Sequence, residues 1–220
     1  MSKNFIIQAA LLIGIVVSVF CEGICAFAES RRGITEDVFR LHVIANSDSD
    51  EDQALKLRVR NAVLEASADI FGEADSAADA KRLSEENLSL FEAAAAAEIA
   101  ASGYDYPVRC EVGTVHFDKR IYGSAELPEG DYSALRVIIG EGEGKNWWCV
   151  MFPALCLPAV TNTDEVLALA EKNGAITSEE LELMQAPENY EVKLYFAEVV
   201  KRLCEKMKKA LFYAVYTGLR

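Results

Sequence analysis

The chain has 220 residues, of which 51% are hydrophobic, 26% charged and 9% aromatic, a composition typical of a globular protein with one or two domains. Lys and Arg number 22 against 35 Asp and Glu, which gives a formal net charge of -13. This excess of carboxylates repels a phosphate backbone, so the composition argues against nucleic-acid binding.

The first 28 residues follow the order of a secretory signal peptide. Lys3 precedes an apolar run from Phe5 to Phe20, and the small-residue triplet Ala26-Phe27-Ala28 comes after it. This order predicts export and cleavage after Ala28, with residues 1–28 as the signal peptide. The alternative is an uncleaved anchor, although a helix that spans a bilayer usually needs about 20 apolar residues.

The segment from residue 38 to residue 101 predicts one strand and two helices. Val38–Ala45 alternates apolar and polar residues, as a half-buried strand does. Ser49 with Asp52 three residues later is typical of a helix cap, so a helix is expected from there to about Gly72. A second helix is expected over residues 76–101.

The next segment alternates in the same way and predicts strands from residue 108, over 132–139 and over 147–152. The last strand is apolar on both sides, which indicates either a central strand or one that meets a partner. Helices are expected over 163–171, 178–185 and 191–214. The last of these helices carries a basic face that is either solvated or contacts anionic headgroups of a membrane surface or an acidic partner. Its residues are Lys201, Arg202, Lys206, Lys208 and Lys209.

These elements predict an α+β fold in which a small antiparallel sheet packs with helices, between the N-terminal signal peptide and a helical C-terminal tail. The expected domains are the α+β core over residues 29–160 and a helical extension over residues 161–220. Cleavage after Ala28 leaves the cysteines at positions 110, 149, 156 and 204. Cys149 and Cys156 are seven residues apart with Pro153 between them, so a turn could bring them to bridging distance; the alternative is buried free thiols.

No pattern in the sequence singles out a metal or catalytic centre. Asp48, Asp50 and Asp52 resemble the start of a calcium-binding loop, but Gln53 stands in place of the required glycine and Val59 in place of the bidentate glutamate. A thiol dyad of Cys149 with His116 would need strand pairing to bring the two residues together. It is not expected, because a thiol inside an apolar strand is a poor nucleophile. The sequence therefore predicts no enzyme, no metal and no cofactor.

Two stretches of the sequence resemble the stage II sporulation protein R family. The first is Phe39-Arg40-Leu41-His42-Val43-Ile44-Ala45-Asn46-Ser47-Asp48-Ser49. The second is Leu135-Arg136-Val137-Ile138-Ile139-Gly140-Glu141-Gly142, followed by Gly144-Lys145-Asn146-Trp147-Trp148-Cys149-Val150-Met151-Phe152-Pro153. The resemblance extends from about Glu36 to Leu157, and Ala154 departs from it where a second proline is expected.

The resemblance implies a protein made in the forespore and secreted into the space between the forespore and mother-cell membranes. There it would activate a membrane-embedded aspartic protease that processes the precursor of sigma factor E. The resemblance therefore implies a signalling protein and not the protease. The alternatives are an extracytoplasmic envelope enzyme, with hydrolase or thiol chemistry, and an envelope-binding module.

The candidates for partner binding come from the two stretches that carry the resemblance. Aromatic anchors beside a glycine-rich loop often dominate interfaces, while core packing and helix capping are the structural alternatives. The candidates are Asn46, Asp48, Glu141, Lys145, Asn146, Trp147 and Trp148.

Overall fold

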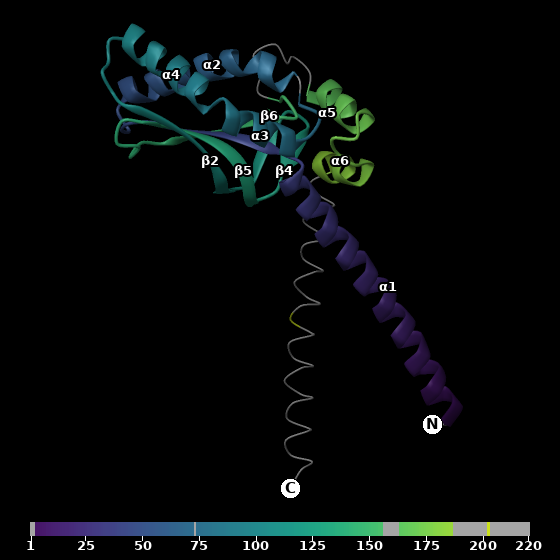
Figure 1. Ribbon diagram of the computed structural model, residues 1–220. Coiled ribbons are helices and arrows are strands. Elements are labelled where there is room, and N and C mark those ends of the chain that lie inside the picture. The colour runs from purple at the N-terminus through teal and green to yellow at the C-terminus, as the bar shows by residue number, and fades with distance from the viewer. Residues whose placement is uncertain (1–2, 73, 156–162, 187–201, 203–220) are drawn as a thin grey trace. The chain divides into compact units, whose positions relative to one another are not determined.

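The computed structural model describes residues 3–72, 74–155, 163–186 and 202 (Figure 1). The chain divides into two units, Met1–Arg31 with Ala186–Arg220 and Arg32–Gln185. The helices are α1 (Lys3–Glu36), α2 (Asp50–Phe71), α3 (Ala77–Glu86), α4 (Leu88–Ala101), α5 (Thr163–Lys172) and α6 (Ser178–Gln185). The strands are β1 (Phe39–Ile44), β2 (Val108–Phe117), β3 (Arg120–Tyr122), β4 (Ala125–Leu127), β5 (Gly130–Ile139) and β6 (Asn146–Phe152).

The predicted signal peptide lies in α1, and the helix continues past Ala28 without a break. Cleavage, the anchor alternative and export therefore stay predictions. Within the described ranges, no helix has the length and hydropathy needed to cross a membrane. The predicted helix over 191–214 and its basic face, apart from Arg202, lie outside the described residues.

The main sheet has four strands in the order β2-β5-β1-β6. Strand β5 runs antiparallel to β2 and parallel to β1, and β6 runs antiparallel to β1. The predicted α+β class is thus confirmed, with a sheet that is mostly antiparallel. The parallel pair is possible because three helices and three strands separate β1 from β5, a connection long enough for a crossover.

Helices α2, α3 and α4 cover one face of this sheet (Figure 1). The apolar residues of β1 and β5 alternate toward these helices, as the period of a strand requires. Leu41, Val43, Leu135 and Val137 are completely buried there. The helices meet them with equally buried side chains, namely Leu55, Val59 and Val63 from α2 and Phe91 and Ala95 from α4.

The helix expected over residues 76–101 is in fact two helices, so this prediction is wrong at its centre. The break falls at Asn87, whose side-chain amide donates to the Leu83 carbonyl oxygen at 2.8 Å. A side chain that bonds to a nearby carbonyl offers the backbone an alternative to the helical ladder. The alanine-rich pattern that follows is helical on its own account as α4.

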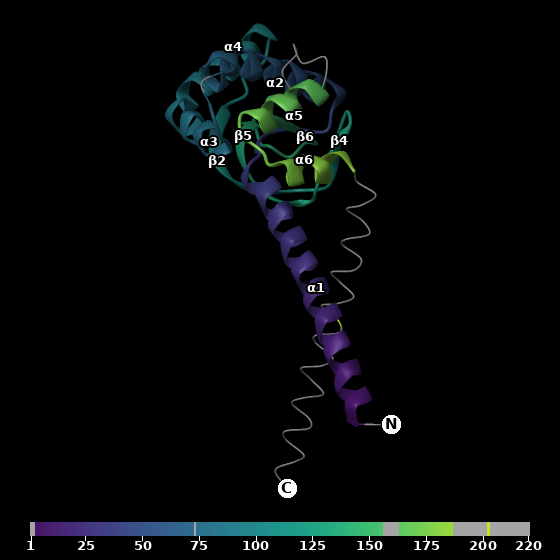
Figure 2. The same cartoon turned by 90° about the vertical axis from the view of Figure 1, so that its right-hand side faces the viewer.

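Strands β3 and β4 and helices α5 and α6 form a second group of elements in the compact unit. Strands β3 and β4 form a separate two-stranded hairpin, α6 contacts β4, and α5 packs beside α6 (Figure 2). Helices α5 and α6 match the two short helices expected from the sequence. The compact unit runs to Gln185 and includes both of them, while the expected core boundary was residue 160.

Candidate interaction site on the sheet

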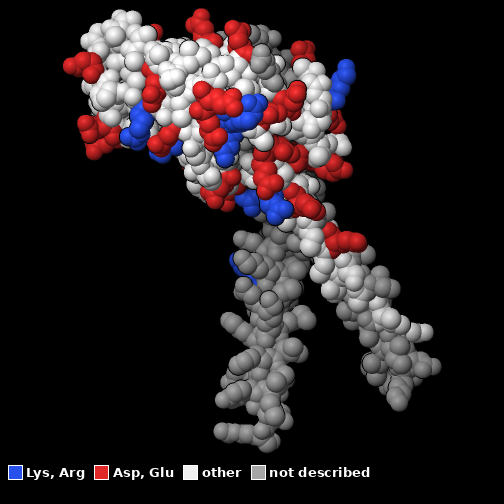
Figure 3. Space-filling view, viewed as in Figure 1, with Lys and Arg blue, Asp and Glu red and all other residues white. Residues whose placement is uncertain are grey.

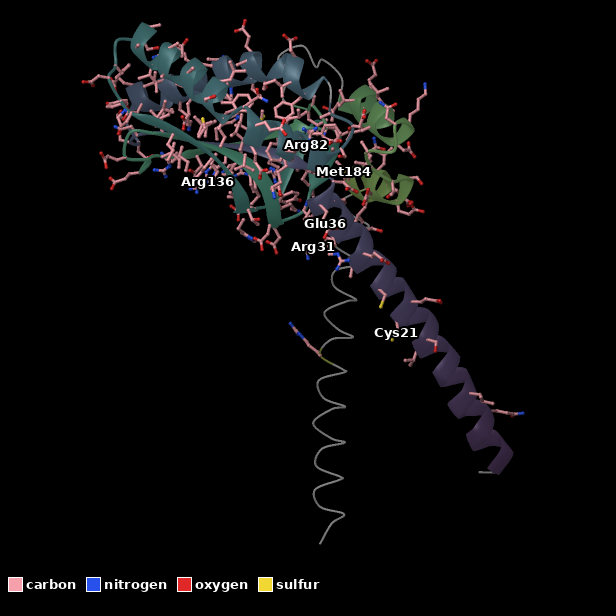
Figure 4. All side chains as sticks on the ribbon, in the orientation of Figure 1. Cys21, Arg31, Glu36, Arg82, Arg136 and Met184 are labelled. Atoms are coloured by element: carbon pink, nitrogen blue, oxygen red, sulfur yellow. The ribbon has the colours of Figure 1, made fainter. Side chains whose placement is uncertain are left out.

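One row of side chains crosses all four strands of the main sheet. Glu111 of β2 pairs with Arg136 of β5, Arg136 pairs with His42 of β1, and His42 pairs with Trp148 of β6. Directly paired residues present their side chains on the same face of a sheet. We call these four residues the cross-sheet row; Figure 4 labels Arg136 among them, on the side of the sheet away from α2 and α4.

Contacts within the cross-sheet row follow its order. The rings of His42 and Trp148 stack with centroids 3.9 Å apart and planes 16° from parallel. Arg136 donates from Nη1 to a Glu111 carboxylate oxygen, and the other Glu111 oxygen lies 3.4 Å from Nε of Arg109. One carboxylate thus serves two guanidinium groups.

His42 is the buried member of the cross-sheet row, with 5% of its surface exposed. Burial lowers the pKa of its imidazole and outweighs the opposite effect of a hydrogen bond with the Asn146 side chain, and the positive charge of Arg136 also lowers this pKa, so the ring is neutral at neutral pH. Nε of Arg136 has no hydrogen-bond partner among the described residues. The row therefore contains a polar atom whose bonding capacity is unused.

Arg40 lies two residues before His42 on the same face and is completely buried. Its guanidinium carbon lies 3.8 Å from the ring centroid of Phe117 and 4.7 Å from that of Tyr132. Its Nη2 donates to the hydroxyl of Tyr122 at 2.6 Å, which ties the β3-β4 hairpin to this end of the face. Burial lowers the pKa of Arg40, and its Nε and Nη1 have no partner within the described ranges.

The two candidate tryptophans lie on opposite faces of β6. Trp148 belongs to the cross-sheet row and is partly exposed. Trp147 pairs with Val43 on the helix-covered face, where the guanidinium of Arg60 from α2 lies 4.2 Å from its ring centroid. Core packing, the structural alternative, thus fits Trp147 better than Trp148.

The two stretches that resemble the family meet where β1 ends. Asn46 accepts at Oδ1 from the backbone N–H of Glu141 at 3.1 Å, and Asp48 accepts at Oδ1 from that of Lys145 at 2.7 Å. The Gly144 N–H donates to the Ala45 carbonyl at 3.0 Å. We call these two segments, residues 45–52 and 140–145, the loop junction.

The polar groups of the loop junction are largely used within it. Lys56 donates from Nζ to the Lys145 carbonyl at 2.9 Å. Asp52 accepts from the Ser47 hydroxyl at 2.6 Å and from the Asn46 amide at 2.8 Å. Burial alone raises the pKa of the Asp52 carboxyl, but these hydrogen bonds outweigh it and hold the pKa below its usual range. The junction thus fixes the loops in place.

Three of the seven candidates are exposed residues at this junction or directly after it. Glu141, Lys145 and Asn146 are exposed. For Glu141 and Lys145 the backbone N–H groups make the contacts across the junction. Asn46 and Asp48, by contrast, use their side chains to hold the two loops together, which is a structural role.

The cysteine predictions concern β6 and the segment after it. Cys149 is 3% exposed and lies at the opposite edge of the sheet from His116 of β2, so these two residues form no dyad. Cys156 lies outside the described residues, and its pairing with Cys149 stays a prediction. The residues that the structure describes contain no cluster of three or more His, Cys, Asp or Glu side chains able to hold a metal ion.

Cys110 is a buried free cysteine on β2. Burial, together with the nearby Glu92 carboxylate, raises the pKa of its thiol to about 12. We expect iodoacetamide at pH 8 to leave Cys110 unmodified in the folded protein and to alkylate it after denaturation, as measured by mass spectrometry of its peptide. Alkylation at equal rates in both states would contradict the burial.

We expect ionisation of the same thiol to destabilise the folded protein in alkali. Its pKa lies well above the ordinary value of a cysteine thiol, at about 12, so between pH 9 and about 12 the thiol ionises in the unfolded chain but not in the folded one. The free energy of unfolding therefore falls as the pH rises through this range. Chemical denaturation of a Cys110→Ala variant should show a smaller fall than wild type over the same range.

Sequence analysis did not select Glu111, Arg136 or His42 as site residues. The sequence did show polar residues on one face of each alternating strand, such as Arg40 and His42 between apolar neighbours. That pattern does not reveal which strands are neighbours or in which register. Only the pairing of β2, β5, β1 and β6 aligns the four side chains.

The fold and the site define a mixed α+β domain whose sheet has helices on one face and a charged and aromatic row on the other. The stage II sporulation protein R family matches the chain over residues 35–162. The chain is also 31% identical over 166 residues to stage II sporulation protein R of Bacillus subtilis (strain 168), covering 75% of the chain and 74% of that relative. No solved structure matches the chain.

The chain belongs to the stage II sporulation protein R family. The resemblance seen in the sequence is thereby confirmed, and membership supports a role in sporulation. The family is named for a stage of sporulation and not for an enzymatic activity. The matched residues all fall within the compact unit Arg32–Gln185.

Proposed function

We propose that this protein is an exported signal of sporulation that activates a membrane-embedded aspartic protease, which then processes the precursor of sigma factor E. In this proposal the protein is secreted from the forespore into the space between the forespore and mother-cell membranes. It binds the protease and favours its active state, which requires tighter binding to that state than to the inactive one.

The observation that carries the proposal is the family match over residues 35–162, which lies within the compact unit. The signal-peptide pattern of residues 1–28 supports export. The cross-sheet row also suits a binding protein, because it leaves charged and aromatic side chains partly exposed on one face of the sheet. The thiol dyad that would have favoured an envelope enzyme is not formed.

The test is co-expression of the full chain with the protease and a tagged sigma precursor in a non-sporulating host. We expect the precursor to shorten on a gel only when both proteins are present and the chain is exported. A chain lacking residues 1–28 is the matched control, because it keeps the compact unit but loses the predicted export signal.

If the precursor does not shorten although the protease is active under another trigger, the signalling proposal is wrong. The envelope enzyme and the envelope-binding module would then be the hypotheses to test. Export itself is measured separately, by the size and compartment of the tagged chain. A retained, full-length protein that still activates the protease would favour the uncleaved anchor over the cleaved signal peptide.

We further propose that Cys149 pairs with Cys156 after export. Cys149 is buried in the middle of β6, and the chain turns after the strand ends at Phe152, where the Leu155 N–H donates to the Pro153 carbonyl at 2.7 Å. Disulfides persist in compartments outside the cytoplasm. Non-reducing peptide mapping of the exported protein should recover the two cysteines in one linked peptide, and their recovery as separate alkylated thiols would contradict the bridge.

A further inference from the structure

We infer that the cross-sheet row is the surface through which this protein recognises its partner, and that the partner presents a carboxylate side chain beside an apolar one. This inference rests on the proposed function, because it names the surface that the protease contacts. It is carried by the geometry of the open face of the sheet.

The central part of this face is open to solvent while both of its ends are covered. At one end the loop of residues 140–145 folds over the sheet, so that Ile44 and Ile138 are buried. At the other end the Arg40 cluster with Phe117 and the β3-β4 hairpin fill the face. Between them the side chains of Arg136 and Glu111 are 32% and 38% exposed.

The charges of this open region favour an acidic partner. Arg109, which is 66% exposed, and Arg136 share the single carboxylate of Glu111, so the three groups together keep one positive charge. The chain as a whole has a net charge of -13, and carboxylates dominate the charged groups over the view in Figure 3. A carboxylate can bind a guanidinium in bidentate geometry, which gives specificity as well as attraction.

The aromatic end of the row supplies the apolar contact. Trp148 is held by its stacking on His42 and by an edge contact with Phe117, whose ring centroid lies 4.6 Å away. Its ring is therefore fixed before binding while part of its surface remains exposed. The row thus presents a fixed, partly exposed indole on one side of His42 and an arginine on the other, and Trp and Arg are both enriched at the energetic centres of protein interfaces.

Gly113 offers a test that does not disturb the row itself. It lies on the same face as Glu111, two residues along β2, and opposite Ala134. A Cβ at Gly113 meets no atom within 4 Å, and its backbone is not in the left-handed region. The Cβ of a glutamate there meets no neighbour, and its carboxylate adds a negative charge to this face.

The experiment is the co-expression assay with the Gly113→Glu variant, with thermal unfolding of the purified exported proteins to verify the fold. We expect activation at least about ten times weaker than wild type, because the new carboxylate repels that of the partner. The matched control is Thr114→Glu, which adds the same charge at the next, exposed residue, whose side chain points to the opposite face. It should activate within about threefold of wild type.

The Gly113→Lys variant separates charge from bulk, and it should also remain within about threefold of wild type. Equal activity of wild type and Gly113→Glu would overturn the surface assignment while leaving the proposed function intact. Equal losses of activation in Gly113→Glu and Gly113→Lys would contradict the inference that the partner is acidic. A wild type without any effect on the protease would remove the proposed function and this inference together.

Discussion

Replacing Gly144 by alanine should destabilise the protein by about 3 kcal/mol, at the upper end of the range for overpacked sites. A Cβ at Gly144 would lie 2.6 Å from the carbonyl carbon of Ser47 and 2.9 Å from Cβ of Ala45. The nearest neighbour is backbone and cannot rotate away, so the loop junction must move apart. For a chain of this size, the melting temperature should fall by about 6 to 12 °C.

The control for this prediction is Gly113→Ala, which adds the same methyl group where no atom lies within 4 Å. It should leave the melting temperature unchanged or raise it slightly, since alanine loses less conformational entropy than glycine on folding. A Gly144→Ala variant as stable as wild type would mean that the two loops do not approach as closely as described.

The second large effect is expected at Arg40, where alanine and methionine substitutions should differ widely. Arg40→Ala removes a completely buried side chain and should cost about 3 to 5 kcal/mol, as other large-to-small core changes do. Arg40→Met keeps most of the volume between Phe117 and Tyr132 and removes a buried charge with two unpaired nitrogens. It should remain within about 1 kcal/mol of wild type, because replacing a poorly compensated buried charge by an apolar group is often neutral.

Chemical denaturation of the two variants distinguishes the loss of side-chain packing from the loss of the guanidinium contacts. Equal and large losses would show that the guanidinium contacts with the aromatic rings and with Tyr122 stabilise the fold more than packing does. The Met variant also bears on the site, because the hydroxyl of Tyr122 lies 3.4 Å from the Trp148 carbonyl oxygen. Arg40 donates to the same hydroxyl, so Arg40→Met should loosen this contact and weaken activation while preserving stability.

The loop junction explains why the two stretches that resemble the family carry so many polar residues. Asn46 and Asp48 were expected either to bind a partner or to cap a helix. In the structure they accept from backbone N–H groups about 95 residues along the chain. The capping role belongs to Ser49, which accepts from the Asp52 N–H at 3.2 Å. Gly140, with φ of 57°, faces the side chain of Asn46, a conformation and a closeness that favour glycine.

The separation of the two tryptophans has a similar consequence for the partner-binding hypothesis. The sequence shows two adjacent aromatic residues on a strand, and adjacent strand residues point to opposite faces. One of them therefore had to face the helices if the other faced away. The position of α2 and Arg60 decides that Trp147 is the one that faces them, which leaves Trp148 for the open face.

The sequence by itself determined the features that depend on neighbouring residues. These include the alternation of β1, the cap at Ser49 with the helix after it, the short helices α5 and α6, and the family to which the chain belongs. The structural features depend on contacts within a few residues, so a local pattern suffices to predict them, and the family follows from similarity of the sequence itself.

Only the tertiary structure decided which segments are neighbours. The parallel pairing of β1 with β5 places Arg136 beside His42, and the order β2-β5-β1-β6 extends that pair into a row from Glu111 to Trp148. Several strand orders and registers satisfy the same alternation of apolar and polar residues, because the period of a strand fixes only which face a side chain takes. The packing of the whole core selects one of them, and with it the candidate site.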